Sequence, residues 1–227
     1  MTSPGARLRG RNWDAFADAV REAVASGPAG EAELVAVVGE LPAARRVLVV
    51  AALGDATGEA GPAALRSVVD TGREQDLLCA AVLALAKRCG AEASADLLAA
   101  LSSKHSAVKD YAVAGLAGAG DGRAWEEVFT RLRHLLGRSA RRHGDVHSSP
   151  VAAAICYLGG HLDGDRCARL VRRLRQRWDR LDADERDWLT GVWPGVGPDG
   201  PAVDGVVPPD PAALRAWIRH PLFEPIH

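Results

Sequence analysis

The residues Ala81-Val82-Leu83-Ala84-Leu85 decide the fold, because the chain repeats this apolar block at nearly fixed intervals. A similar block, Val50–Leu53, lies 32 residues earlier, and another, Ala112–Leu116, lies 31 residues later. A further 42 residues lead to Ala154–Leu158, so the last interval is longer by about one loop. Self-similarity at a period of about 20 to 50 residues is typical of proteins built from stacked repeats.

A second apolar segment with helical spacing follows each block. The same intervals that relate the blocks place Leu65 on Leu97 and Val69 on Leu101. One such helix pair is too small to bury its own apolar face, so we expect the pairs to stack on a shared core. The four expected pairs occupy residues 41–70, 73–102, 106–135 and 150–180 of a region that spans 41–180.

Non-repeating elements are expected on both sides of the pairs. Asn12 is a favourable cap for a first helix, and residues 191–211 contain five glycines and six prolines, which favours an extended segment laid over the helices. The expected elements are a mobile basic tail at 1–11, cap helices at 12–39, a helix at 183–193, the Gly/Pro-rich segment at 191–211 and a C-terminal helix at 212–220.

The repeated blocks, with the partner segments around Leu97, Val128 and Leu170, resemble the HEAT and armadillo-like superfamily of α-solenoids. The resemblance covers about 140 of the 227 residues. It implies one all-α domain, a right-handed α-α superhelix (a HEAT-like solenoid) of about four central helix pairs with non-repeating caps. It also implies that the second helices line a concave binding face. The alternative is a non-repetitive helical bundle whose alanine-rich helices match by chance.

Charge is distributed unevenly along the chain, although the formal net charge is only −1. Residues 123–180 carry 13 arginines against six acidic residues, which gives this region a charge of +7. Residues 181–227 carry three basic and eight acidic residues. A local excess of this size predicts a basic surface, whereas the whole chain gives no electrostatic reason to bind DNA or an anionic membrane.

The basic region contains the candidate binding residues. At about 100° per residue, one helix over 166–180 would align five arginines in a stripe beside Trp178. Guanidinium groups in such a stripe suit phosphates or an acidic protein surface; the alternative is a solvated outer face. The inserted loop at about 137–150 is the second candidate, with a plain connection as its alternative. The predicted partner-binding residues are Arg131, Arg133, Arg138, Arg141, Arg142, Arg166, Arg169, Arg173, Arg177 and Trp178.

Cysteine and histidine residues give little support for a metal site. Cys156, His161 and Cys167, with His147 nearby, do not have a known zinc-finger spacing. Both cysteines also lie in apolar helical patterns, where a free thiol is an ordinary core group. We therefore expect no metal and no cofactor.

The chain lacks the common catalytic motifs for nucleophilic, phosphate-binding and zinc-dependent chemistry. It resembles the alkylpurine DNA glycosylases built on HEAT-like repeats in size and helical composition, but it lacks their motif of two tryptophans and an aspartate. Trp178-Asp179 and Asp187-Trp188 are the neighbouring aromatic and acidic residues here, and the alternative is that both tryptophans belong to the core.

The sequence thus favours a non-enzymatic binding or scaffold protein that recruits a macromolecule, most readily another protein, through the concave face or the basic 131–180 edge. Alternatives are a nucleic-acid binder, including a glycosylase, and a dedicated inhibitor or immunity-type partner of one protein. The longest apolar run, Val47–Leu53, is far shorter than the ~20 residues that span a bilayer. We expect no membrane partner and a cytoplasmic location with reduced thiols.

Overall fold

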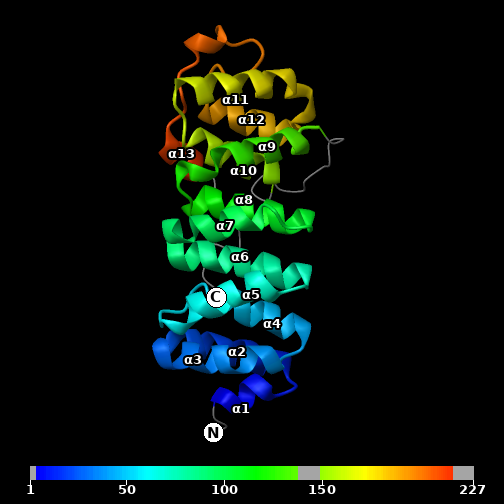
Figure 1. Cartoon of the computed structure of the whole chain (residues 1–227), viewed down its shortest axis with the longest axis vertical. Coiled ribbons are helices and arrows are strands. Elements are labelled where there is room, and N and C mark those ends of the chain that lie inside the picture. The colour runs from blue at the N-terminus through cyan, green and yellow to red at the C-terminus, as the bar shows by residue number, and fades with distance from the viewer. Residues whose placement is uncertain (1–3, 138–148, 217–227) are drawn as a thin grey trace.

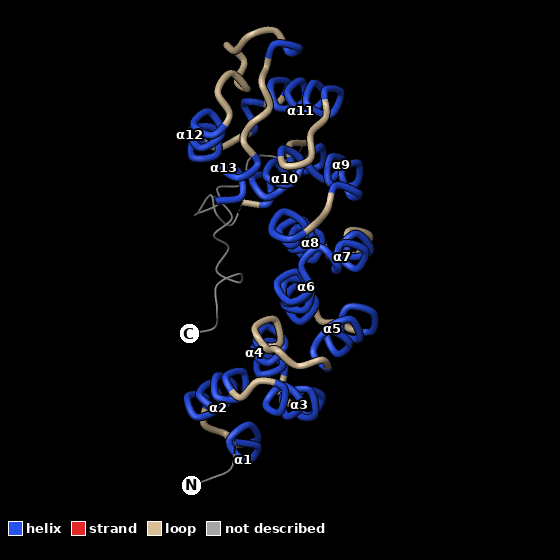
Figure 2. The backbone as a smooth tube through the Cα atoms, turned by 90° about the vertical axis from the view of Figure 1, so that its left-hand side faces the viewer, coloured by secondary structure: helices blue, strands red, loops and turns tan. Residues whose placement is uncertain are grey.

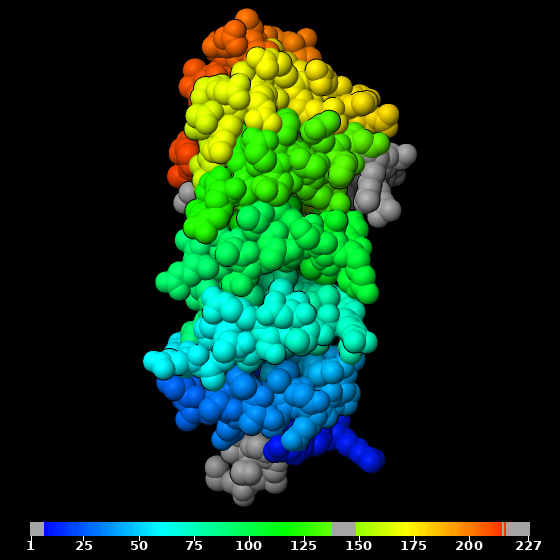
Figure 3. Space-filling model, viewed as in Figure 1, coloured from blue at the N-terminus to red at the C-terminus, as the bar shows by residue number. Residues whose placement is uncertain are grey.

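The computed structural model describes residues 4–137 and 149–216. In this part of the chain the structure is all-helical, with 13 α-helices, several 3₁₀ turns and no strand. The expected all-α class is therefore confirmed. Figure 1 shows helices α1 to α11 following one another along a single long axis, with α13 lying back beside α10, and the space-filling view in Figure 3 shows an elongated column without a break between its two ends.

Ten of the helices form two parallel layers, which are separated most clearly in Figure 2. The first layer contains α2 (Trp13–Ala25), α4 (Ala43–Ala52), α6 (Gln75–Cys89), α8 (Ser106–Ala119) and α10 (Pro150–Gly159). The second layer contains α3 (Pro28–Val37), α5 (Ala60–Thr71), α7 (Ser94–Ala100), α9 (Trp125–Leu135) and α11 (Gly164–Gln176). The remaining helices are α1 (Pro4–Arg9), α12 (Ala183–Val192) and α13 (Pro211–Ala216).

Local sequence fixes where several of these helices begin. The side chains of Asn12, Ser149 and Asp163 each accept a hydrogen bond from a backbone N–H in the first turn of α2, α10 and α11. Asp182 and Glu185 form a reciprocal capping box at the start of α12. These side chains satisfy N–H groups that have no partner within the helix, so each one marks a helix start.

The core runs through the middle of the first layer. In α6 every residue from Leu77 to Ala86 is buried, as are residues 112–117 of α8 and 151–159 of α10. A helix that is apolar on all sides is stable only when it is enclosed by other elements. The repeated block that organises the sequence is therefore the central core of the molecule.

The N-terminal region differs from the sequence-based expectation. We expected a mobile basic tail over residues 1–11, but residues 4–9 form α1. Leu8 is fully buried, and Arg7 forms an ion pair with Glu22 of α2. Six residues carry too little periodicity to indicate a helix, because the apolar contact of α1 consists mainly of one leucine.

The basic helix is also shorter than expected. A continuous helix to Arg180 was predicted, but α11 ends at Gln176 and a 3₁₀ turn follows at Trp178–Arg180. Arg177 leaves the helical conformation, with φ −131° and ψ 25°. The prediction that Arg177 and Arg180 continue the stripe of Arg166, Arg169 and Arg173 was therefore wrong.

The Gly/Pro-rich segment after α12 packs against α11. Trp193 is fully buried, and its Nε1 donates to the carbonyl of Val207 at 2.8 Å. From α11, Arg175 donates to the carbonyls of Gly195 and Val196, at 2.8 and 3.1 Å. These contacts give the segment a fixed place on the second layer although it contains little regular structure. Residues 217–220 of the expected C-terminal helix lie outside the described part.

The column is bowed. In Figure 2 its ends, α2 and α12, are displaced toward the side on which the first layer lies. The second layer, which includes the basic helix α11, thus lies on the outer side of the bow. The resemblance placed the second helices on the concave side, so the arrangement differs from that expectation.

Candidate anion-binding site

Some of the predicted basic residues form contacts within the fold, and the others remain available to bind an external anion. Arg131 belongs to the first group. It is buried, its Nη2 lies 2.6 Å from an oxygen of Asp110 in α8, and it also donates to Ser106. A buried guanidinium that already has a carboxylate partner has little left to offer an external anion.

Arg166 and Arg169 of α11 are also engaged. Arg169 forms a two-pronged ion pair with Glu126 of α9, with both N–O distances at 2.8 Å. Its guanidinium covers the rings of Trp125 and Phe129, at 4.9 and 5.0 Å from the ring centroids. Arg166 lies 5.3 Å from the Trp125 ring and pairs with Asp163. These contacts join α9 to α11 and neutralise this part of the stripe.

Three arginines at the C-terminal ends of α9 and α11 behave differently, and we call them the arginine cluster: Arg133, Arg173 and Arg177. None of them pairs with a carboxylate in the described part of the chain. Arg173 donates to the backbone carbonyl of Arg133 at 3.2 Å, and its Nε is buried without a partner. Arg133 is exposed, and Arg177 is partly exposed.

Electrostatics within the arginine cluster are repulsive. Partial burial lowers the pKa of Arg173 below its ordinary value, and the positive charges of Arg177 and Arg133 lower it further. The carbonyl groups at the ends of α9 and α11 offset part of this repulsion, because helix C-termini carry partial negative charge. An anion bound among the three guanidiniums would remove the rest, since guanidinium groups form charge-assisted hydrogen bonds with carboxylates and phosphates.

The other predicted site residues contribute little to this cluster. Trp178 is partly exposed and lies beside Gly197 of the Gly/Pro-rich segment, where a side-chain carbon would be 3.4 Å from its ring. Its position is that of a packing residue. The predicted loop residues Arg138, Arg141 and Arg142 lie outside the described residues. The cluster therefore retains Arg133, Arg173 and Arg177 from the predicted set.

The two thiols that were considered as metal ligands are buried core groups that donate to backbone carbonyls. Cys156 and Cys167 are buried, and their Sγ atoms donate to the carbonyls of Leu214 and Val206 at 3.4 and 3.9 Å. Burial raises the pKa of both thiols, so the deprotonated form that a metal requires is disfavoured. Within residues 4–137 and 149–216 no group of three potential ligands has metal-binding geometry.

Comparison of the sequence with models of known protein families and with curated proteins gave no match. Among the described helices, none is both long and apolar enough to cross a membrane. The case for a function therefore depends on the geometry of the arginine cluster and of the surfaces around it.

Proposed function

We propose that this protein is an α-solenoid of HEAT type that acts as a non-enzymatic binding protein, and that the arginine cluster recognises an acidic segment of a partner protein. One observation carries the proposal. Arg133, Arg173 and Arg177 lie together and have no carboxylate partner among the residues that the structure describes, whereas Arg131, Arg166 and Arg169 each have one. The two-layer stacking of consecutive helix pairs supports the solenoid part of the proposal.

Carboxylates around the arginine cluster favour a short acidic segment over a nucleic-acid duplex. Glu126 pairs with Arg169, Asp163 with Arg166 and Asp179 with Arg180. The predicted arginines that lack a described carboxylate partner therefore lie together at the C-terminal ends of α9 and α11. A duplex presents one negative charge per ~1.7 Å along its axis, and it binds tightly when many phosphates are neutralised together. Three unpaired guanidiniums match a few carboxylates better than a long phosphate track.

The direct test is a fluorescence-anisotropy titration of the full chain with a labelled hexaglutamate peptide and, in parallel, with a labelled DNA duplex. The informative variant is Arg133→Gln with Arg177→Gln, because neither side chain forms a hydrogen bond or ion pair with any other described residue. Arg173 is kept because it contacts the end of α9. Each lost charge contact costs about 0.5 to 1 kcal/mol at a partly exposed site, so we expect about fivefold to 30-fold weaker peptide binding.

A matched control carries Arg11→Gln with Arg73→Gln. Both residues are exposed, their side chains form no hydrogen bond or ion pair with a described residue, and the change in net charge is identical. The proposal requires the control to bind the peptide like the wild type. Equal losses in both variants would mean that only overall charge matters, and tighter, steeply salt-dependent duplex binding would assign the cluster to nucleic acid instead.

A further inference from the structure

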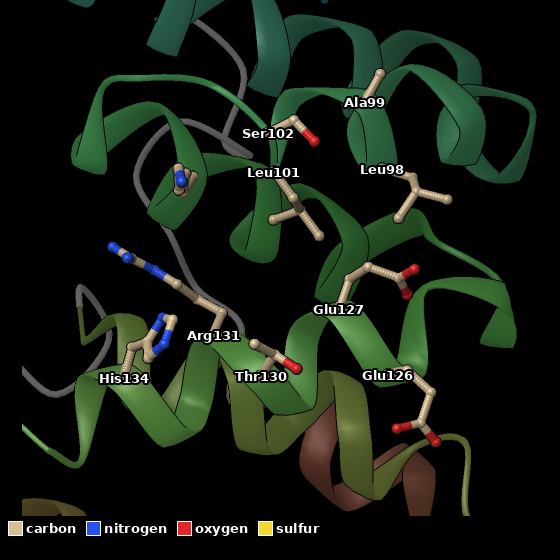
Figure 4. A pocket seen from close by; sticks show the side chains of 10 residues that line it. Leu98, Ala99, Leu101, Ser102, Glu126, Glu127, Thr130, Arg131 and His134 are labelled. Carbon is tan, nitrogen blue, oxygen red and sulfur yellow. The ribbon is translucent and has the colours of Figure 1, made fainter.

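A groove lies on the other flank of α9, between α7 and α9. Its volume is about 500 Å³. Leu98 and Leu101 form an apolar floor, and small residues on the α7 side, Ala99 and Ser102, leave it open. In Figure 4 the carboxylates of Glu126 and Glu127 lie at one end, whereas Arg131 and His134 lie at the other. The groove is therefore apolar in the middle and oppositely charged at its two ends.

This groove occupies the one step of the second layer that no charged side chain bridges in the described structure. Between α3 and α5, Glu31 accepts a hydrogen bond from the backbone N–H of Gly61 at 2.6 Å. Between α5 and α7, Arg66 pairs with Asp96 at 3.0 Å. Between α9 and α11, Glu126 pairs with Arg169. The step from α7 to α9 has no counterpart, which leaves its lining groups available to a ligand.

Three charged or titratable groups of the groove have no partner within the described part of the chain. Among the described residues, the side chains of Glu127, Lys109 and His134 form neither a hydrogen bond nor an ion pair. Glu126 and Arg131, by contrast, are paired with Arg169 and Asp110. The unpaired groups thus have a fixed arrangement, with the Glu127 carboxylate toward the N-terminal end of α9, the His134 imidazole near its C-terminal end and the Lys109 ammonium lining the groove from α8.

The length of the groove sets the size of the ligand. Glu127 and His134 are seven residues apart on one helix, which at 1.5 Å per residue corresponds to about 10 Å. In a peptide extended as a polyproline-II helix, which has three residues per turn and a rise of about 3.1 Å, the first and fourth residues lie on the same face about 9 Å apart. A four-residue segment in this conformation can therefore place one charged side chain at each end of the groove, while the two apolar side chains between them point to either side, within reach of Leu98 and Leu101.

We propose that the groove between α7 and α9 binds a short extended peptide segment of a partner protein in which two apolar residues separate a basic residue from an acidic one. The basic residue pairs with Glu127, and the acidic residue pairs with Lys109 and His134. This site is independent of the arginine cluster, because it uses the opposite flank of α9 and residues that the cluster does not include.

The test uses the full chain with ¹³C-labelled leucine methyl groups and the blocked peptide acetyl-Lys-Leu-Leu-Glu-amide as the probe. We expect saturable shifts of the Leu98 and Leu101 methyl signals, assigned through Leu98→Ile and Leu101→Ile. The uncharged peptide acetyl-Gln-Leu-Leu-Gln-amide is expected to bind about twofold to fivefold more weakly for each lost charge pair. Equal affinity of the charged and uncharged peptides would overturn the assigned polarity.

Two variants test the location of the site. Ala99→Arg introduces a long side chain at an exposed groove position and is expected to abolish the saturable shifts. Glu127→Lys is expected to lower the affinity for the Lys-Leu-Leu-Glu probe by a factor of about two to five or more. Glu33→Lys is the same change at an exposed position on α3, and it is expected to leave this affinity unchanged. No saturable shift in the wild type, or undiminished binding by Ala99→Arg, would overturn the proposal.

Discussion

At the scale of single residues, the charged groups of this chain act mainly as internal connectors. Glu31 is fully buried in α3 and accepts hydrogen bonds from the backbone N–H groups of Gly58 and Gly61, at 2.7 and 2.6 Å. Arg88 of α6 lies 3.3 Å from the same carboxylate and donates to the carbonyls of Ala56 and Gly58. The side chains of Glu31 and Arg88 therefore fix the loop between α4 and α5.

Replacing Glu31 tests this role. Glu31→Gln removes the charge that Arg88 faces and turns one acceptor oxygen into an NH₂ group that cannot accept from a backbone N–H. Breaking a buried pair by changing one partner costs about 3 to 5 kcal/mol. We expect a loss of that order in the free energy of unfolding, measured by urea denaturation with circular dichroism. Glu33→Gln, at an exposed position on the same helix, is expected to stay within about 0.5 kcal/mol of the wild type.

Such pairings could not be predicted from the sequence. Glu31 and Arg88 are 57 residues apart, and Glu126 and Arg169 are 43 apart. The composition of residues 123–180 correctly indicated a local excess of arginine, but it could not show which guanidiniums already have carboxylate partners. The arginine cluster is what remains after those pairings are assigned, and only the fold assigns them.

At the scale of helices, apolar spacing was the reliable signal. Two helices lie in each of the expected ranges 41–70, 73–102, 106–135 and 150–180, apart from small differences at their ends. Periodicity works here because each helix buries a continuous apolar face. It did not reveal the groove between α7 and α9, since Leu98 and Leu101 have the same spacing as core residues. It also could not place the end of α11, where no glycine or proline interrupts the pattern.

Close contact between helices gives a prediction for Gly30. A side-chain carbon at this position of α3 would lie 1.9 Å from the backbone carbonyl oxygen of Ala23 in α2. Gly30→Ala therefore has to push α2 away from α3, and overpacking of this kind typically costs about 1 to 3 kcal/mol. Thermal unfolding should show the loss as a lower midpoint temperature.

Gly39 supplies the matched control for this substitution. Nothing lies within 4 Å of a side-chain carbon at Gly39, which follows the same helix and does not have a positive φ. Gly39→Ala should be neutral or stabilise the protein by up to about 1 kcal/mol, because alanine has less freedom than glycine in the unfolded chain. Equal destabilisation by both alanines would show that α2 and α3 do not depend on close approach at Gly30.

At the scale of the whole molecule, burial in the core raises the pKa of a cysteine thiol and of a tyrosine hydroxyl. Burial raises the pKa of the Cys79 thiol from 9.0 to about 11, and nearby Asp76 adds to the shift. Burial likewise raises the pKa of the Tyr157 hydroxyl from 10.0 to about 12. In the unfolded chain these groups would lose their protons at their ordinary pKa values. Above those values the folded state thus binds more protons than the unfolded state.

This difference in bound protons makes the stability of the fold depend on pH. Stability falls with rising pH wherever the folded state holds more protons, so the free energy of unfolding should decline between about pH 9 and about pH 12. The thiol of Cys79 alone contributes on the order of 1 kcal/mol by about pH 10. Urea midpoints measured at intervals over this range test the expectation. Cys79→Ala should show a shallower decline, and an identical slope in that variant would contradict the assignment to this thiol.

The stacked arrangement has a mechanical consequence. Each helix pair contacts mainly the pair before it and the pair after it, so a pull along the long axis loads the interfaces in series. When interfaces are loaded in series, the weakest interface opens at the lowest force. Within the described residues, no charged side chain links α7 to α9, whereas a carboxylate–backbone hydrogen bond or an ion pair links the helices at each of the other three steps of the second layer. Tension on this molecule would therefore open the peptide groove before it disturbs the rest of the column.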